Sequence, residues 1–528
     1  MSRARQNAWA VLVGLASAVV TLAIAEVVAL FVDPGASPLL AVGSLVIDLV
    51  PGWIKDLVIS LFGTNDKLVL IICLGILVAV LASVLGVLEY RRPPWGTVGL
   101  VLVGGVATIA VTTRAQATAG WAVPTVLGVI AGVLVLRFGA IWLRDWVGTE
   151  RTAPSASGTA VQHAMVPAPG AAVSRRRFLV FVGGTGAAAL IIGIGARALN
   201  AGTVAVKAVR DAVTLPKPAV AAPPIPAGAQ LDVPGITPLV TPNSDFYRID
   251  TALQVPSVDA SAWRLKVTGM VENEVEIGFN ELLALPLIET TVTLMCVSNE
   301  VGGNLAGNAV WLGYPIRDLL ARAKPVAGAD MVLSRSVDGF TAGTPLAVLL
   351  ETDRDSLLAV GMNGSPLPLE HGFPVRMVVP GLYGYVSATK WVVELNVTRF
   401  ADASAYWTNR GWSPMGPVKT ESRIDVPSGG SQVTAGTVAI AGVAWAQHTG
   451  IDRVEVRVDD GAWSEARLAT AISTDTWVQW VYEWQATRGN HTIQVRATDA
   501  TGATQSSTNV PPVPNGAEGW HTVQVGVT

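Results

Sequence analysis

Four apolar runs, each close to the length of a membrane span, dominate the first part of this 528-residue chain. They cover residues 8–32, 68–88, 96–113 and 121–143. A helix needs about 20 apolar residues to cross the hydrocarbon core of a bilayer, and its backbone groups must be paired within the segment. We therefore predict an all-α membrane domain with four spans over residues 1–148.

A fifth apolar run, residues 39–62, is interrupted by polar residues and a proline (Asp48, Pro51, Lys55 and Asp56). Arginines flank the four longer runs (Arg3, Arg5, Arg91, Arg92, Arg144 and Arg151). If residues 39–62 do not cross the membrane, all of these arginines fall on one side, which the positive-inside rule identifies as the cytoplasm. We therefore predict that this segment is re-entrant or interfacial.

A Pro/Ala/Ser-rich linker, residues 149–173, leads into an apolar segment preceded by arginines, residues 174–200. Ser174, Arg175, Arg176, Phe178 and Leu179 fit the twin-arginine export pattern, and a plain transmembrane helix with basic flanking residues is the alternative. Either way, the arginines lie in the cytoplasm and the chain after about residue 200 lies outside. We predict a multi-pass plasma-membrane protein, in contact with lipid, whose globular part faces away from the cytoplasm.

The part after residue 200 differs in composition and in its pattern of apolar residues. Residues 201–240 are a Pro/Ala-rich stretch that we interpret as an extracytoplasmic tether. Residues 241–415 mix alternating runs such as WRLKVTG with helical segments such as YPIRDLLARA, which predicts an α+β domain. Residues 416–528 contain regularly spaced alternating runs, which predict an immunoglobulin-like β-sandwich.

Charge excludes one class of partner. The formal net charge is −3, and no basic patch interleaved with aromatic residues stands out, so nucleic acid is not an expected partner.

Cysteine usage is more informative, because the chain has 2 cysteines and they lie far apart. Cys73 lies in an apolar run, whereas Cys296 lies in the globular part. A free thiol in that setting is a metal ligand, a nucleophile or without function.

Two strings around Cys296 carry a family resemblance: LMCVSNEVGGNLAGNAVWLGYPIRDLL and GMNGSPLPLEHGFPVRMVVPGLYGYVSATKW. They resemble the sulfite-oxidase family of molybdopterin enzymes. The resemblance covers roughly residues 241–528, and it includes the sandwich, which resembles the dimerisation domain of that family. It implies a molybdopterin-binding catalytic domain over residues 241–415 and a possible homodimer.

The resemblance also implies a site. Cys296 is expected to bind molybdenum through its thiolate, which is a soft ligand suited to such a metal. Arg248 is expected both to contact the cofactor and to take part in catalysis. Further residues are expected to bind the cofactor: Phe246, Tyr247, Asp338, His371, Arg376, Ser387, Thr389 and Lys390.

The sequence departs from the sulfite-oxidase pattern at two places. The string after the cysteine is CVSNEV, with Glu300, where sulfite oxidases have a CAGNRR-like string, and Val360 and Gly361 stand where they have a tyrosine. Loss of cationic residues disfavours an anionic substrate, and the molybdenum-dependent methionine-sulfoxide reductases of bacterial envelopes also lack this pattern. We expect oxygen-atom transfer to or from a small S- or N-containing molecule. The alternatives are a sulfite dehydrogenase and a cofactor-free envelope protein that binds or scaffolds.

Electron supply is limited by the residues available for redox centres. The chain has 5 histidines, and none lies in a predicted span (His163, His371, His448, His491 and His521). It has no Cys-x-x-Cys-His motif for haem and no cysteine set for an iron–sulfur cluster. We therefore expect molybdenum–molybdopterin without haem or iron–sulfur cluster, and a separate electron carrier, either a cytochrome or a quinone-linked membrane protein.

Overall fold

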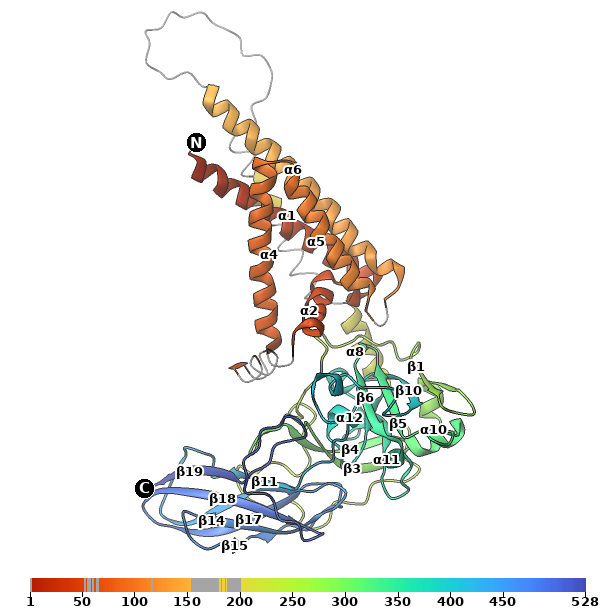
Figure 1. The fold of residues 1–528 in the computed structure, drawn as a ribbon. Coiled ribbons are helices and arrows are strands. Elements are labelled where there is room, and N and C mark those ends of the chain that lie inside the picture. The colour runs from red at the N-terminus through yellow and green to blue at the C-terminus, as the bar shows by residue number, and fades with distance from the viewer. Residues whose placement is uncertain are drawn as a thin grey trace, which may run out of the picture. The chain divides into compact units, whose positions relative to one another are not determined.

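The computed structural model describes residues 2–51, 66–114, 117–152 and 201–528, with a few isolated positions between 54 and 62 and between 180 and 187. The chain divides into two compact units (Figure 1). The first consists of Met1–Ala205 with Ala252–Ser257, and the second of Val206–Thr251 with Val258–Thr528.

The first unit is helical, as the sequence predicts. Four of its helices are long and apolar enough to cross a membrane by length and composition: α1 (Arg3–Val32), α4 (Asp66–Arg91), α5 (Trp95–Thr112) and α6 (Ala122–Thr152). Shorter helical segments are η1 (Pro34–Ala36), α2 (Pro38–Leu49) and η3 (Ala119–Trp121). Helix α6 continues past the predicted end of the domain into the predicted linker.

Small residues bring these helices together. A Cβ atom added at Gly14 of α1 would lie 2.0 Å from the carbonyl oxygen of Ala82 in α4. A Cβ added at Gly132 of α6 would lie 1.9 Å from Oγ1 of Thr21, and Ser17 Oγ donates a hydrogen bond to the Gly132 carbonyl at 2.8 Å. Close backbone approach and buried hydrogen bonds of this kind are how apolar helices associate in lipid.

The predicted re-entrant segment is only partly described. Helix α2 has 12 residues, which span about 18 Å, and a bilayer core is about 30 Å thick. The rest of the segment lies mostly outside the described residues, as do nearly all of the linker 149–173 and the anchor 174–200. Their predictions therefore stand as predictions.

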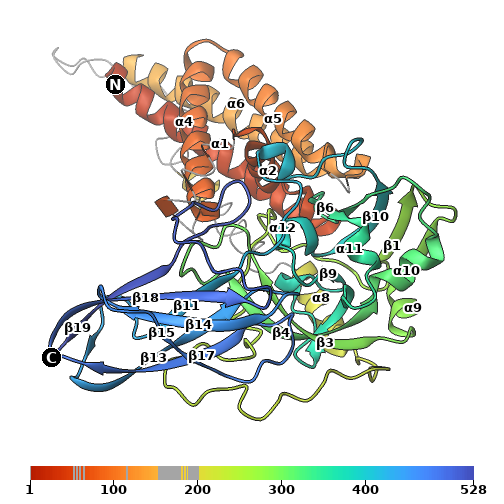
Figure 2. The ribbon, with the colours of Figure 1, turned by 60° about the horizontal axis from the view of Figure 1, so that its bottom comes forward.

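The second unit begins with an α+β domain, visible in green in Figure 2. One sheet has the order β2-β1-β10-β5-β6. Its strands are β1 (Arg264–Gly269), β2 (Val275–Gly278), β5 (Met331–Ser336), β6 (Thr341–Pro345) and β10 (Val392–Thr398). Short helices lie between the strands: α9 (Phe279–Leu283), α10 (Ile316–Ala323), α11 (Leu346–Leu350) and α12 (Gly384–Ser387).

The other sheet of this domain carries the predicted site strings. Its order is β3-β4-β7-β8, and β9 pairs with β7. The strands are β3 (Ile288–Met295), β4 (Ala306–Pro315), β7 (Leu357–Met362), β8 (Ser365–Pro366) and β9 (Arg376–Val378). Because β3 ends at Met295, Cys296 is the first residue after a buried strand.

The C-terminal part is the predicted β-sandwich, drawn in blue in Figures 1 and 2. One sheet contains β11 (Glu421–Val426), β13 (Gly436–Trp445), β17 (Val478–Ala486) and β16 (Arg467–Leu468). The other contains β12 (Gln432–Val433), β19 (His521–Val527), β18 (Gly489–Asp499), β14 (Ile451–Val458) and β15 (Ser464–Glu465). Alternate residues of both sheets, such as Ile440, Val454 and Ile493, fill the core between them.

Part of the stretch predicted as a tether is folded. Helix α8 (Ala201–Ala212) begins it, and the Arg210 guanidinium donates hydrogen bonds of 2.8 Å to the carbonyls of Leu367 and Pro366. Leu231 and Ile236 are buried in the core of the sandwich. The Pro/Ala-rich composition concealed this, because isolated apolar residues bury as well in an extended segment as in a strand.

Candidate molybdopterin site

Cys296 lies in a tight loop that is closed by backbone hydrogen bonds. Its N–H donates to the carbonyl of Leu305 at 3.0 Å, and its carbonyl accepts from Asn299 N at 3.1 Å. The Asn299 side chain accepts a third bond from Leu305 N at 2.8 Å. The Cys296 thiol is free and buried, with Sγ 2.9 Å from Ser298 Oγ, and burial raises its pKa. The loop therefore fixes the position of one free sulfur atom.

The sandwich holds the strand that leads to this loop. Thr293 of β3 donates its N–H to the carbonyl of Asp475 at 3.0 Å. Its hydroxyl accepts from Trp477 N at 2.8 Å, and its carbonyl accepts from Gln447 Nε2 at 3.4 Å. Thr293 is fully buried, so these bonds are shielded from water. The position of Cys296 thus depends on both domains.

An aromatic cluster lies next to the cysteine. The rings of Phe246 and Tyr247 stack with centroids 5.2 Å apart, and Phe246 meets His371 edge to face at 5.5 Å. Burial raises the pKa of Tyr247, and the negative charge of Cys296 raises it further. His371 Nε2 donates to the Asn243 carbonyl at 3.2 Å, and burial lowers the pKa of His371 to about 4. The imidazole is therefore neutral.

Arg376 is a buried cation held by carbonyl groups. Its guanidinium donates to the carbonyls of Met377 at 3.3 Å, His371 at 3.2 Å and Ala388 at 3.5 Å. It also lies over the Trp311 ring, 5.1 Å from the centroid. Burial lowers its pKa to about 10, so it keeps its charge at neutral pH. No carboxylate pairs with it in the part of the chain that the structure describes, which leaves it suited to an anionic ligand.

Lys390 and Arg248 share one carboxylate. Asp250 Oδ2 lies 2.7 Å from Lys390 Nζ and 2.9 Å from Arg248 Nε. Burial lowers the pKa of Lys390 to about 8, and Asp250 opposes that shift. Asp338 is close enough that Asp250 and Lys390 both affect its pKa, which burial raises. The sequence prediction did not include Asp250, although it stands only two residues after Arg248.

Ser387 and Thr389 are fully buried, and their hydroxyl groups already have protein partners. Ser387 Oγ donates to the carbonyls of Leu382 and Tyr383 at 3.2 and 2.9 Å. Thr389 Oγ1 lies 2.7 Å from Ser334 Oγ. Any contact of these two residues with a cofactor would therefore have to use their backbone groups or remaining lone pairs.

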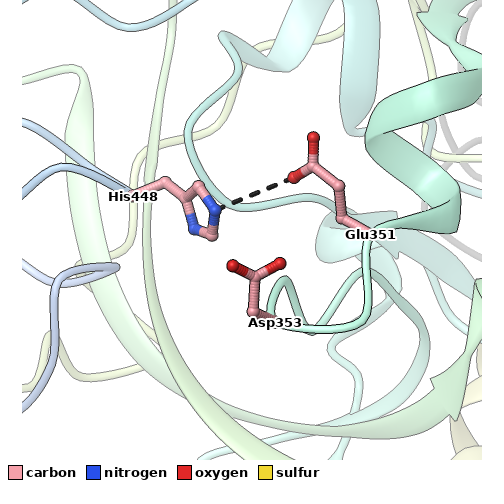
Figure 3. Close-up of side chains that lie close together, drawn as sticks. All are labelled: Glu351, Asp353 and His448. Carbon is pink, nitrogen blue, oxygen red and sulfur yellow. Dashed lines mark ion pairs between the residues drawn. The ribbon is translucent and has the colours of Figure 1, made fainter.

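A separate group of potential ligands lies elsewhere in the second unit (Figure 3). Glu351, Asp353 and His448 bring one ligand atom each to within 4.8 Å of the others. His448 Nδ1 lies 3.1 Å from an oxygen of Asp475, and Arg354 Nε lies 2.6 Å from Glu351 Oε2. Because the Arg354 guanidinium already neutralises Glu351, we interpret this group as an ionic link between the sandwich and the catalytic domain.

Comparison with protein families gives two matches. The family described as "Oxidoreductase molybdopterin binding domain" matches residues 252–407, and the "Bacterial Ig domain" family matches residues 421–495. These matches coincide with the α+β domain and with most of the sandwich.

Similar proteins include sulfite oxidases. Mitochondrial sulfite oxidase of Mus musculus is 31% identical over 271 residues, which are 43% of this chain and 49% of that protein. Sulfite oxidase of Arabidopsis thaliana is 28% identical over 305 residues, covering 47% of this chain and 77% of that protein. The uncharacterized oxidoreductase YuiH of Bacillus subtilis is 34% identical over 159 residues, covering 30% of this chain and 76% of that protein.

The chain spans about half the length of the mammalian relatives that it matches. Among solved structures, the sulfane dehydrogenase SoxCD from Paracoccus pantotrophus is similar over 54% of this chain and 81% of that chain. Its TM-score is 0.48 and its sequence identity is 23%.

Proposed function

Because this chain belongs to the sulfite-oxidase family of molybdopterin-dependent oxidoreductases, we propose that it transfers an oxygen atom to or from a small, uncharged S- or N-containing substrate. The observation that carries the substrate class is the charge around Cys296. From Ser298 to Gly303 the loop holds a single charged residue, the carboxylate of Glu300. Glu300 is exposed on this loop, so its carboxylate would repel an anion such as sulfite that approaches the loop.

Arg248 restores only part of the positive charge. It is the one arginine that the family resemblance places at the substrate, and its guanidinium pairs with Asp250. The same carboxylate also binds Lys390, so two cations and one anion share a hydrogen-bonded group. An arginine paired in this way attracts a second anion less strongly than a free one.

The residues present fit the cofactor. Cys296 would bind the metal, and Arg376 would bind the anionic part of the pterin, since a guanidinium donates two parallel hydrogen bonds to a phosphate. Lys390 would donate a further hydrogen bond, and the neutral His371, whose one N–H is used by the Asn243 carbonyl, would accept one at Nδ1. When bound, molybdenum–molybdopterin supplies the exchangeable oxygen and the two-electron change.

Reduction of an oxide consumes two electrons and two protons: R₂S=O + 2e⁻ + 2H⁺ gives R₂S + H₂O. We infer that a separate carrier delivers the electrons, a cytochrome or a quinone-linked membrane protein, with no haem or iron–sulfur cluster in this chain. The helical unit supports membrane anchoring near such a carrier. The flanking arginines support a catalytic domain on the extracytoplasmic side of the plasma membrane.

Sulfite dehydrogenase is a second candidate, favoured by the names of the relatives. Steady-state kinetics on one metal-replete preparation separates the two. We expect turnover of a sulfoxide or N-oxide with an artificial reductant, and at least tenfold lower kcat/KM for sulfite with an artificial oxidant. Sulfite turnover at about 10⁴ M⁻¹ s⁻¹ or above would overturn the proposal. Protein purified without molybdenum from cells that make the cofactor would instead support a binding or scaffold role.

A further inference from the structure

A narrow cavity lies beside the Cys296 loop. Its lining comes from both domains: Met295, Asn299, Glu300, Val301, Gly302, Tyr383, Glu421, Trp445 and Ala517. It has room for about one water-sized group. Met295 precedes Cys296, and Asn299 N donates to the Cys296 carbonyl at 3.1 Å, so the cavity adjoins the expected metal ligand.

The sandwich contributes two buried polar side chains to this cavity. Glu421 is the first residue of β11 and Trp445 the last of β13, and the two residues are directly opposite each other in the antiparallel pair. Side chains of such a pair lie on the same face of the sheet. Trp445 is 1% exposed and Glu421 is 7% exposed.

The indole of Trp445 has an unused hydrogen-bond donor. Its Nε1 is buried and has no hydrogen-bond partner among the described residues. An indole N–H only donates, so the group that completes it must be an acceptor. Buried polar groups of native proteins are almost always paired, and an exception at a cavity beside a metal ligand indicates a bound acceptor.

Glu421 is a second donor. Gln505 Nε2 donates to its Oε2 at 2.8 Å, and the amide oxygen of Gln505 accepts from Ser422 Oγ at 2.7 Å, which fixes the amide. Burial raises the pKa of Glu421 to about 9. The neighbouring carboxylate of Glu518 adds to this shift, and the Gln505 bond and Lys419 oppose it. At neutral pH the Glu421 carboxyl therefore keeps its proton and can donate it to an acceptor.

The charge of the lining selects the kind of acceptor. No lysine, arginine or histidine is among the nine lining residues, and Glu300 adds a carboxylate. The Tyr383 hydroxyl supplies one more polar group, with Lys419 N at 3.5 Å. A site with neutral donors and no cation suits an uncharged acceptor oxygen and disfavours an anion.

We propose that the Glu421 carboxyl and the Trp445 indole N–H form a subsite that holds the oxide oxygen of an uncharged sulfoxide or N-oxide beside Cys296. The subsite rests on the proposed function, because it assumes an oxide substrate. Its size, about that of one oxygen-sized group, fits the oxide oxygen and leaves the rest of the substrate outside the cavity.

Two tryptophans give a matched test. Trp480, like Trp445, is buried with an unpartnered Nε1, but it belongs to the sandwich core and does not line the cavity. We expect Trp445→Phe to raise the Kd of methyl phenyl sulfoxide about five- to tenfold, the effect of one lost hydrogen bond. Trp480→Phe should leave it within twofold. Kd is measured by titration calorimetry on molybdenum-loaded protein without reductant, and KM with an artificial reductant.

Glu421 provides an independent pair of variants. Glu421→Gln keeps a donor and should bind the sulfoxide within about threefold of the parent, whereas Glu421→Leu removes it and should bind at least tenfold more weakly. Molybdenum content and the thermal midpoint of unfolding show whether each variant is folded and loaded with metal. If Trp445→Phe does not retain the metal, the comparison of Glu421→Gln with Glu421→Leu tests the subsite instead.

The outcomes separate the subsite from the proposed function. If the parent reduces sulfoxides but Trp445→Phe and Glu421→Leu bind them like the parent, the subsite is wrong and the function stands. The same holds if these variants only lower the thermal midpoint, since the cavity then holds a structural water. If the parent neither binds nor reduces any oxide, both proposals fail.

Discussion

At the scale of single residues, the two cysteines of the chain allow a controlled test of which one binds the metal. Cys296 is buried and fixed in a closed loop, and Cys73 lies in the apolar helix α4. We expect Cys296→Ser to lose nearly all bound molybdenum while the protein still folds, because a serine hydroxyl is a poor substitute for a soft thiolate. Metal analysis and circular dichroism measure the two properties.

Cys73→Ser is the control, and it should retain about one molybdenum per chain. Equal molybdenum content in the two variants would rule out Cys296 as the metal ligand.

His371 should make the stability of the cofactor-free protein depend on pH. Its pKa is lowered to about 4 in the folded chain, against about 6.5 when unfolded. The unfolded state therefore binds more protons between these values, and stability present above pH 6.5 is lost as the pH falls towards 4. The loss attributable to this residue is up to about 3 kcal/mol.

The measurement compares the thermal midpoint of the parent and of His371→Gln in detergent from pH 4 to pH 7. The variant should show a flatter profile over that range. Identical profiles would mean that His371 is not buried as a neutral imidazole.

At the scale of elements, the sheet that carries Arg376 and leads into the Cys296 loop depends on a close approach of two strands. A Cβ at Gly313 of β4 would lie 2.5 Å from the carbonyl oxygen of Leu358 in β7. We expect Gly313→Ala to destabilise the catalytic domain by about 2–3 kcal/mol, as overpacking does, and to lower molybdenum content. Gly429→Ala, where a Cβ meets nothing closer than 3.9 Å, should change neither. If Gly313→Ala leaves the stability of the domain unchanged, the two strands can move apart without a cost in free energy.

Elements were predicted well from the sequence where an apolar pattern extends over many residues, and poorly where burial comes from isolated contacts. The four apolar helices, β1 and α10 follow their patterns closely. Helix α8 was missed although its residues are amphipathic, because it begins a Pro/Ala-rich stretch that was interpreted as a tether. In the apolar stretch FPVRMVVPG, residues 373–381, only the three residues of β9 form a strand, since prolines near both ends interrupt the pairing.

The candidate site shows the same limit. The binding roles of Cys296, Arg376 and His371 remain predictions, but these residues could be proposed from the sequence because the family strings contain them. The Glu421–Trp445 pair could not. Those residues lie more than a hundred positions after Cys296 in an ordinary strand pattern, and only the folded sandwich brings them to the cavity.

At the scale of the whole molecule, topology is open to a direct test. We expect reporter fusions after residues 92 and 150 to indicate the cytoplasm, and fusions after residue 205 to indicate the exterior, because the flanking arginines stay inside. An exterior signal at 92 would mean that residues 39–62 cross the membrane. Replacing Arg175 and Arg176 by lysine should block export of the folded domain, and unaffected export would point to the general secretory route.

The hydrogen bonds from Thr293 to the sandwich have a consequence for the order of events during synthesis. A ribosome completes the segment around Cys296 long before it adds Gln447, Asp475 and Trp477, which fix that strand. A nascent chain that ends after the catalytic domain therefore lacks the partners that position its metal ligand. We therefore expect cofactor loading to follow translation of the sandwich. A truncated mRNA should yield protein that cannot mature, even though every residue expected to contact the cofactor has been made.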